Sequence, residues 1–173
     1  MEKTIELKRK DYADYNIYVY FKKMRSRLVI TVLGFALLFS FILADYSPFN
    51  IGNFSLTFIL CLLGFGVVYP LLMMILLQFM RFIPSKGGSI LGKRTFKISN
   101  EGLIEISNSN TNVQKWASVK SVESNHNAVY IFVDNVMAYI LPNRYFKNQE
   151  EQTSFIKAIE EKIRFKFDQM YKK

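Results

Sequence analysis

The sequence predicts a membrane protein of the α+β class. In this fold a two-helix transmembrane hairpin is followed by a small antiparallel β-sheet, which an amphipathic C-terminal helix caps. Three observations support it. Asp45 is the only formal charge between Leu28 and Arg81, the pattern changes to strand-like alternation after residue 93, and an apolar stripe at helical spacing occupies the C-terminal end.

Residues 1–27 form the predicted N-terminal segment. Thr4–Lys8 alternates apolar and polar residues, which predicts a strand. Such a strand is too short to be stable alone, so we expect it to join the C-terminal sheet. Asp11 is the predicted N-cap of a helix, with Asp14 in the capping-box position. Its tyrosines and the two lysines that follow suit the headgroup layer, which predicts an interfacial helix. The alternative is that the tyrosines pack on the soluble domain.

The predicted hairpin occupies residues 28–82, with spans at about 28–44 and 54–80. A bilayer core of about 30 Å needs roughly twenty apolar residues per helix, and both runs approach or exceed that length. Proline lacks the backbone N–H of a helix interior, so it favours a bend. We therefore expect the second span to kink around Gly64, Gly66 and Pro70.

Charge predicts the orientation of the hairpin. The formal net charge is +9, and basic residues crowd both outer flanks of the hairpin, whereas the break between the spans has no Lys or Arg. Basic flanks stay cytoplasmic, so both termini are expected there. The same side chains are candidate contacts to anionic lipid headgroups: Lys22, Lys23, Arg25, Arg27, Lys86, Lys93 and Arg94. This location explains the positive charge, and we expect no nucleic-acid partner.

A linker at residues 83–93 leads into a domain predicted at 94–173. Strands are predicted at 95–99, 103–107, 113–116, 119–124, 129–133 and 137–141, the last stopped by Pro142. A helix is predicted from about 148 to 171. Its apolar stripe consists of Phe155, Ile159, Ile163, Phe167 and Met170. We expect this helix to cover one end or face of the sheet.

No catalytic residue, metal site or cofactor is predicted, and we expect a protein that is not an enzyme. Gly87–Lys93 matches the start of a phosphate-binding loop, but Arg94 replaces the Ser or Thr that holds magnesium. His126 is the only histidine and lies in a polar turn, without the further ligands that a metal needs. Cys61 is the only cysteine, so no intramolecular disulfide can form.

A motif in the C-terminal half resembles a known family. Trp116 begins a Trp-x-x-Val step, and the last predicted strand ends in Ile-Leu-Pro-Asn-Arg-Tyr-Phe at 140–146. Both are similar to the YcxB-like family, whose C-terminal domain carries Trp-x-x-[Ile/Val] and Ile-Leu-Pro-x-Arg-x-Phe. The segment Leu7–Phe21 is similar to the Asp-Tyr step and aromatic helix that precede the hairpin in that family.

The resemblance implies a bacterial protein of the cytoplasmic (inner) membrane with a pleckstrin-homology-like (PH-like) domain, a sheet roll plugged by the C-terminal helix. It gives the motif residues structural roles: Trp116 as a core anchor, Leu141 and Pro142 at the strand end, Arg144 at the strand-to-helix corner, and Phe146 under the helix.

Three hypotheses for function follow. The first is a non-enzymatic membrane protein that presents its domain to another protein, with an exposed sheet edge as the docking site. The second is an immunity protein against a membrane-acting toxin, which would depend on the kinked second span. The third is a sensor or binder of anionic lipid headgroups. Self-association into a homo-oligomer is compatible with each of them.

Overall fold

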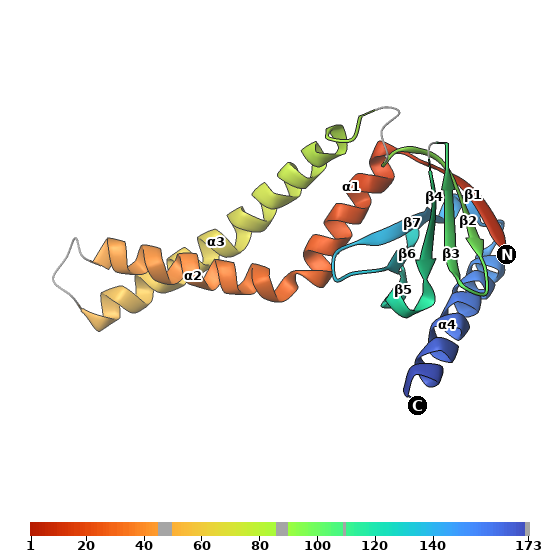
Figure 1. The fold of residues 1–173 in the computed structure, drawn as a ribbon. Coiled ribbons are helices and arrows are strands. Elements are labelled where there is room, and N and C mark those ends of the chain that lie inside the picture. The colour runs from red at the N-terminus through yellow and green to blue at the C-terminus, as the bar shows by residue number, and fades with distance from the viewer. Residues whose placement is uncertain (45–49, 86–89, 109, 172–173) are drawn as a thin grey trace. The chain divides into compact units, whose positions relative to one another are not determined.

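The computed structural model describes residues 1–44, 50–85, 90–108 and 110–171 (Figure 1). In the described residues a strand and then helices precede the linker, and strands and then a final α-helix follow it. In chain order the elements are β1 (Glu2–Leu7), α1 (Arg9–Tyr18), the π-helical turn η1 (Val19–Lys23), α2 (Arg25–Ala44), α3 (Ile51–Phe79), the 3₁₀ turn η2 (Met80–Phe82), β2 (Gly92–Ile98), β3 (Gly102–Ser107), β4 (Thr111–Lys115), the 3₁₀ turn η3 (Trp116–Ser118), β5 (Ser121–Ser124), β6 (Ala128–Phe132), β7 (Ala138–Pro142), the 3₁₀ turn η4 (Asn143–Tyr145) and α4 (Gln149–Tyr171).

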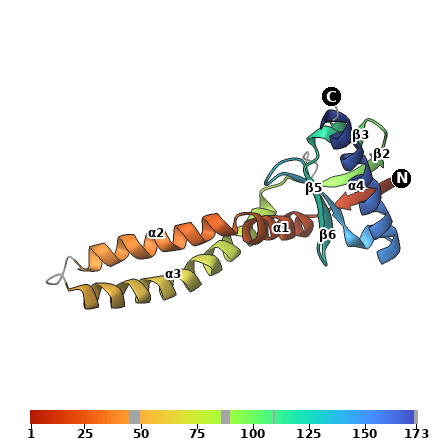
Figure 2. The same cartoon turned by 90° about the horizontal axis from the view of Figure 1, so that it is seen from below.

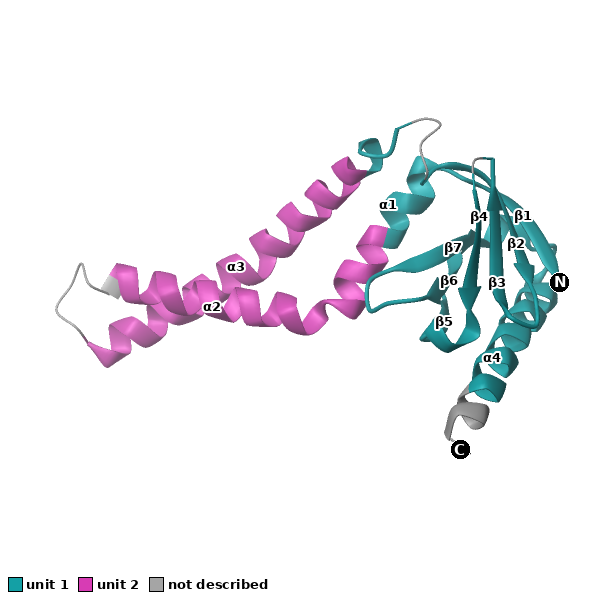
Figure 3. Cartoon of the chain, viewed as in Figure 1, with its two compact units in different colours: residues 1–15, 81–173 teal, residues 16–80 magenta. Residues whose placement is uncertain are grey.

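The chain divides into two compact units (Figure 3). One unit combines residues 1–15 with residues 81–173, and the other consists of residues 16–80. The sequence-based division kept residues 1–27 together as one segment. In the structure the first fifteen residues instead belong with the C-terminal domain, because β1 and the start of α1 pack there.

The hairpin unit contains two helices that are long and apolar enough to cross a membrane, Arg25–Leu43 and Ile51–Phe82. They pack on each other through one face of α2, where Val32, Ala36 and Ser40 are buried at a spacing of four residues. The Phe65 ring lies 5.8 Å from that of Phe35 and 5.0 Å from that of Phe39, measured between centroids. Most of the other large apolar side chains of both helices are exposed, as the surface of a lipid-facing helix requires.

The helix boundaries extend the predicted spans by about three residues at their N-terminal ends. The Asn50 side chain caps α3 by accepting a hydrogen bond from the Gly52 N–H at 2.8 Å. The second span remains one continuous helix through Pro70. The predicted break residue Asp45 lies outside the described residues.

The domain unit begins with a four-stranded antiparallel sheet in the order β1-β2-β3-β4. β1 pairs with β2 from Glu2↔Lys97 to Leu7↔Gly92, although the whole hairpin lies between these strands in the sequence. The expectation that the N-terminal strand joins the C-terminal sheet is therefore confirmed. The domain is discontinuous, and the hairpin is inserted between its first two strands.

A second antiparallel sheet has the order β5-β6-β7, and β6 is buried along its whole length. α4 packs against β5 and η3. Figures 1 and 2 show the helix alongside the strands of the domain. The core between these layers contains Phe96, Leu103, Trp116, Phe132, Leu141, Phe155 and Ile159, each at most 1 % exposed.

After the linker the described residues follow the predicted pattern, with six strands, β2 to β7, and a final helix in the expected order. Phe155 and Ile159 of the predicted apolar stripe are buried and Ile163 is half-buried, so this part of the stripe faces the sheets. The side chains of Phe167 and Met170 lie outside the described residues. Two antiparallel sheets with a C-terminal helix make the domain α+β, as predicted.

Candidate functional site

The basic residues before the first span lie close together in the sequence and are exposed. Lys22 and Lys23 end η1, and Arg25 and Arg27 begin α2. The Lys22 ammonium donates a hydrogen bond to the Tyr18 hydroxyl at 2.8 Å. Four cations just before an apolar helix match the arrangement expected for contact with anionic headgroups. Lys86, the next candidate, lies outside the described residues.

Lys93 and Arg94 are neighbours on β2 and therefore point to opposite faces of the sheet. Lys93 is exposed on the outer face, whereas Arg94 faces inward and forms an ion pair with Glu105, with both side chains more than four-fifths buried. The Arg94 Nε is buried without a hydrogen-bond partner among the described residues. The two candidate headgroup ligands are thus separated, and Arg94 has a partner within the domain.

Tyr139 lies beside this buried ion pair. Its hydroxyl accepts a hydrogen bond from the Asn112 Nδ2 at 3.1 Å, and its ring is 5.6 Å from that of Phe96. Burial raises the pKa of Tyr139, and the nearby Glu105 carboxylate adds to the effect. A phenol with a raised pKa stays protonated at neutral pH, so this group serves as a hydrogen-bonding side chain between the two sheets.

Trp116 and Phe146 pack as the resemblance implies. Trp116 is 1 % exposed, and its indole N–H donates to the Ser99 carbonyl at 3.0 Å, which satisfies its one polar atom. The Phe146 ring lies 5.6 Å from that of Phe155 on α4. Leu141 is fully buried, and Pro142 is buried at the end of β7. These four motif residues are therefore part of the hydrophobic core.

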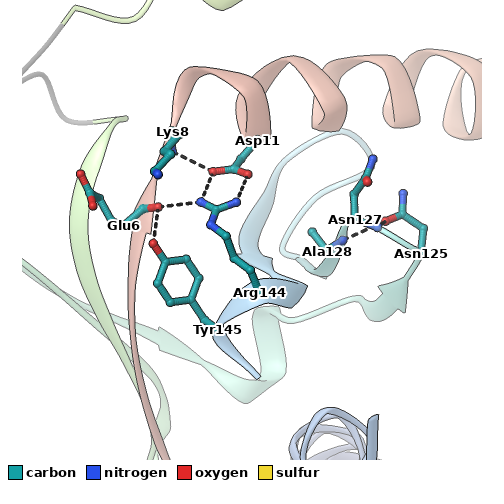
Figure 4. A network of polar contacts seen from close by, with 8 residues as sticks. All are labelled: Glu6, Lys8, Asp11, Asn125, Asn127, Ala128, Arg144 and Tyr145. Carbon is teal, nitrogen blue, oxygen red and sulfur yellow. Dashed lines mark hydrogen bonds and ion pairs between the residues drawn. The ribbon is translucent and has the colours of Figure 1, made fainter. Parts of the chain in front are cut away.

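Arg144 is the centre of a polar network that joins distant segments (Figure 4). Its guanidinium donates two hydrogen bonds to the Asp11 carboxylate, at 2.6 and 2.7 Å, and a third to the Glu6 carbonyl at 3.0 Å. The Tyr145 hydroxyl donates to the same carbonyl at 3.1 Å. Hydrogen bonding to Asp11 raises the pKa of Arg144 further above its already high range. The corner after β7 thereby holds β1 and α1.

Asp11 does not act as the N-cap that the sequence predicts, because α1 begins two residues earlier, at Arg9. Asp11 is the third helical residue, and its carboxylate accepts a hydrogen bond from the Lys8 backbone N–H at 2.8 Å. In a capping box, the side chain of the third helical residue accepts a hydrogen bond from the backbone N–H of the N-cap residue, and Asp11 makes this bond to Lys8. The error arose because the ion pair to Arg144 is a long-range contact that local spacing does not reveal.

A second polar cluster ties the turn after β5 to the same corner. The Asn125 side-chain oxygen accepts hydrogen bonds from the backbone N–H groups of Asn127 and Ala128, at 2.8 and 2.9 Å (Figure 4). The Asn143 side chain donates to the Asn125 carbonyl at 2.8 Å and accepts from the buried Gln152 of α4. These contacts fix the turn that contains His126, whose own side chain is exposed.

The chemistry of these networks is that of a scaffold. Asp11 is neutralised by Arg144, and Glu105 is neutralised by Arg94. Within the described ranges, no three His, Cys, Asp or Glu side chains gather closely enough to hold a metal ion.

The four outer strands of the two sheets differ in how their free sides are covered. The Glu6 carbonyl of β1 accepts from both Arg144 and Tyr145, and Lys3 of β1 donates to Glu151 at 2.6 Å. β7 contacts β1, and β5 contacts α4. β4 is paired with β3 on one side, and the described residues show no strand paired with its other side. β4 is thus the candidate docking edge.

The outer face of the four-stranded sheet adjoins this edge. Ile106 and Val113 are 41 % and 46 % exposed. On that face Ile106 pairs with Thr111, and Val113 pairs with Ile104. The exposed lysines of the same face are Lys93, Lys97 and Lys115. The sequence hypothesis named an exposed sheet edge without saying which one. The pairing of β1 with β2 shows that the opposite edge is β1, whose Glu6 carbonyl already accepts from Arg144 and Tyr145.

Comparison with known families agrees with the sequence resemblance. Residues 98–159, from the end of β2 into α4, match the family model described as YcxB-like protein. The matched segment contains both motifs, so this part of the chain is similar to YcxB-like proteins. No curated protein and no solved structure gives a significant match.

Proposed function

We propose that this chain is a non-enzymatic membrane protein that presents a PH-like domain on the cytoplasmic side, where an extended segment of another protein binds along the free side of β4. The observation that carries the proposal is that, among the described residues, no strand pairs with the side of β4 that faces away from β3. The two apolar helices supply the anchor, and the YcxB-like domain supplies the docking surface.

The way the hairpin joins the domain supports placing both ends of the hairpin on the same side of the membrane. Leu7 and Gly92 are Cα partners in the first sheet, so the chain leaves and re-enters the domain at adjacent strands. The exposed cations Lys22, Lys23, Arg25 and Arg27 lie at or just before the start of the first spanning helix, and Arg81 lies at the end of the second. The positive-inside rule assigns that side to the cytoplasm, which for a YcxB-like bacterial protein is the inner face of the cytoplasmic membrane.

The arrangement of strands supports a PH-like assignment. A four-stranded and a three-stranded antiparallel sheet are followed by one C-terminal helix, which packs against β5 and η3. In this interpretation the insertion of the hairpin after β1 does not change the domain. It only lengthens the connection between the first two strands.

Addition of a strand to β4 would use backbone groups that β3 leaves unpaired, and backbone hydrogen bonds of this kind provide affinity with little dependence on sequence. Specificity would come from side chains on the outer face. Ile106 and Val113 offer apolar contacts there, and Lys115 offers a positive charge. A fitting partner segment is extended, with an apolar residue opposite Val113 and an acidic residue near Lys115.

The test is site-specific photo-crosslinking in cells with the full-length protein. A photoreactive residue replaces Val113 on β4 in one variant and Thr4 on β1 in the matched control, since both side chains are exposed on the outer face. We expect a crosslink to a foreign protein from position 113 and none from position 4. Equal products from both positions, or only uncrosslinked protein, would contradict docking at β4.

Binding of anionic lipid headgroups is the second candidate, and the three exposed lysines of the outer face favour it. Lipid-linked products from position 113, without a protein partner, would select this alternative. A purely electrostatic contact would also weaken as salt is raised, whereas strand addition would persist.

A further inference from the structure

The turn between β6 and β7 presents apolar side chains to solvent at its tip. Val136 is 43 % exposed and Met137 is 61 % exposed. The turn itself is held by backbone hydrogen bonds, from the N–H groups of Val133 and Asp134 to the Met137 carbonyl, at 2.9 and 3.2 Å. Two adjacent large apolar side chains at the tip of a hydrogen-bonded turn form a small apolar surface that a membrane could take up.

Helix α1 holds this turn. The Tyr15 hydroxyl donates a hydrogen bond to the Val136 carbonyl at 2.6 Å, and the Tyr15 ring packs 5.7 Å from that of Tyr130 on β6. Tyr15 is only 7 % exposed, and burial raises the pKa of its phenol, so it remains a donor at neutral pH. The turn is therefore fixed to the stretch of chain that leads to the first span.

The length of that stretch limits how far the turn can lie from the bilayer. From Tyr15 to Arg25 the chain is helical except at Met24, as α1, η1 and the start of α2. Ten residues at a rise of roughly 1.5 Å per residue give about 15 Å of chain. Leu28, where the uncharged run begins, is three residues further on. The polar layer of each leaflet is about 5–8 Å deep, so this length of chain allows the turn to reach that layer.

The charges of the turn are compatible with this position. Its carboxylate, Asp134, forms an ion pair with Lys120 at 2.7 Å, and this hydrogen bond lowers the pKa of the Asp134 carboxyl. The aspartate therefore brings no uncompensated negative charge to an anionic surface. Lys22 and Lys23, which follow α1, place positive charge on the same stretch of chain.

We infer that the β6–β7 turn is a second membrane contact, in which Val136 and Met137 enter the headgroup–acyl boundary of the leaflet where the first span begins. This contact orients the domain on the bilayer and is independent of the docking edge on β4. A loop of this size gains affinity from the apolar area it buries, and the hairpin supplies the proximity.

The experiment uses the full chain in vesicles of phosphatidylcholine and phosphatidylglycerol. Cys61→Ser removes the native thiol, and Met137→Cys receives an environment-sensitive fluorophore. The control is Glu101→Cys in the β2–β3 turn, at the end of β2 remote from the linker. Native-like Trp116 emission in both proteins confirms that the domain is folded.

We expect the label at position 137 to emit at shorter wavelength than the label at 101. Nitroxides near the top of the acyl chains should quench it several-fold more strongly, and aqueous iodide should quench it less. Equal quenching at the two positions would overturn the inference. Protection of position 137 from both quenchers would overturn it as well, because protein rather than lipid would then cover the turn.

Discussion

The Asp11 carboxylate and the Arg144 guanidinium form a two-hydrogen-bond ion pair across 133 residues of sequence, at 2.6 and 2.7 Å. Asp11 lies in the segment before the hairpin, and Arg144 lies in the YcxB-like segment after it. The pair therefore joins the two parts of a domain that the membrane hairpin separates in the chain. The Asp11 side chain is only 8 % exposed. Burial of its charge would be costly without the ion pair to Arg144.

Replacing Arg144 with leucine should destabilise the domain. Loss of a fully buried partner costs roughly 3–5 kcal/mol, and because the Arg144 side chain is 41 % exposed we expect about 2 kcal/mol. Trp116 is the single tryptophan and is buried in the domain, so its fluorescence during denaturation in detergent measures this change. Arg164→Leu, at an exposed position on α4, is the control and should have little effect.

The double variant Asp11→Asn/Arg144→Leu separates the ion pair from other effects of losing the arginine. Because the uncompensated carboxylate is then absent, part of the lost stability should return. If the double variant were as unstable as the sum of both single variants, the two residues would not be coupled.

Ile5 tests whether β1 contributes to the core of the domain. It is 1 % exposed, and truncation of such a residue leaves a cavity, so Ile5→Ala should cost about 3 kcal/mol of unfolding free energy. Ile106→Ala is the matched control, since Ile106 is 41 % exposed on the same sheet. Equal denaturation midpoints for Ile5→Ala and the parent protein, followed through Trp116, would mean that β1 is not part of the domain.

Gly102 tests the packing of β3 against β4. A Cβ atom at this position would overlap the Gln114 carbonyl group, whose carbon would be only 2.8 Å away. Since backbone cannot yield as a flexible side chain does, Gly102→Ala should cost about 1–3 kcal/mol and displace the β4 edge. Gly64→Ala in α3 is the control, because the space around that glycine is open. A stability loss from both variants alike would contradict this explanation.

The contact between Lys3 of β1 and Glu151 of α4 should make stability depend on pH. The hydrogen bond from Lys3 lowers the pKa of Glu151 in the folded state. A lowered pKa stabilises the fold above the usual pKa of a glutamate, and the contribution is lost as the pH falls through the folded-state pKa. Glu151→Gln should therefore be less stable than the parent at neutral pH and indistinguishable from it in strong acid. Glu150→Gln, at the exposed neighbouring position, should show no such convergence.

Local sequence patterns were sufficient for most of the secondary structure. Alternation and turn residues predicted the strands now seen as β2 to β7, and helical spacing predicted that Phe155 and Ile159 share the buried face of α4. Charge and hydropathy predicted two helices of membrane-spanning length. These features depend on neighbours within one element, which is the range over which periodicity carries information.

Features that depend on long-range pairing were harder to predict. The spacing of Asp11 and Asp14 predicted a cap at Asp11 and gave no sign of its remote partner Arg144. Arg94 was grouped with Lys93 although alternation along β2 separates them. The edge left open for docking also depends on which strand covers the other side of the sheet. The spacing of residues within a strand does not say which other strand it pairs with.

Pairing of β1 with β2 across the hairpin is the central claim, because it makes β1, which Arg144 and Tyr145 contact, one edge of the sheet and β4 the other. Thr4 and Thr95 are Cα partners, with their hydroxyl oxygens 2.9 Å apart. The most direct test is disulfide formation in Thr4→Cys/Thr95→Cys, with Cys61→Ser, in native membranes and with mass spectrometry of the linked peptides. Thr4→Cys/Thr111→Cys, which places the second thiol on β4, is the control. We predict an efficient disulfide between positions 4 and 95 and none between positions 4 and 111. Absence of the disulfide between positions 4 and 95 under mild oxidation would contradict the account.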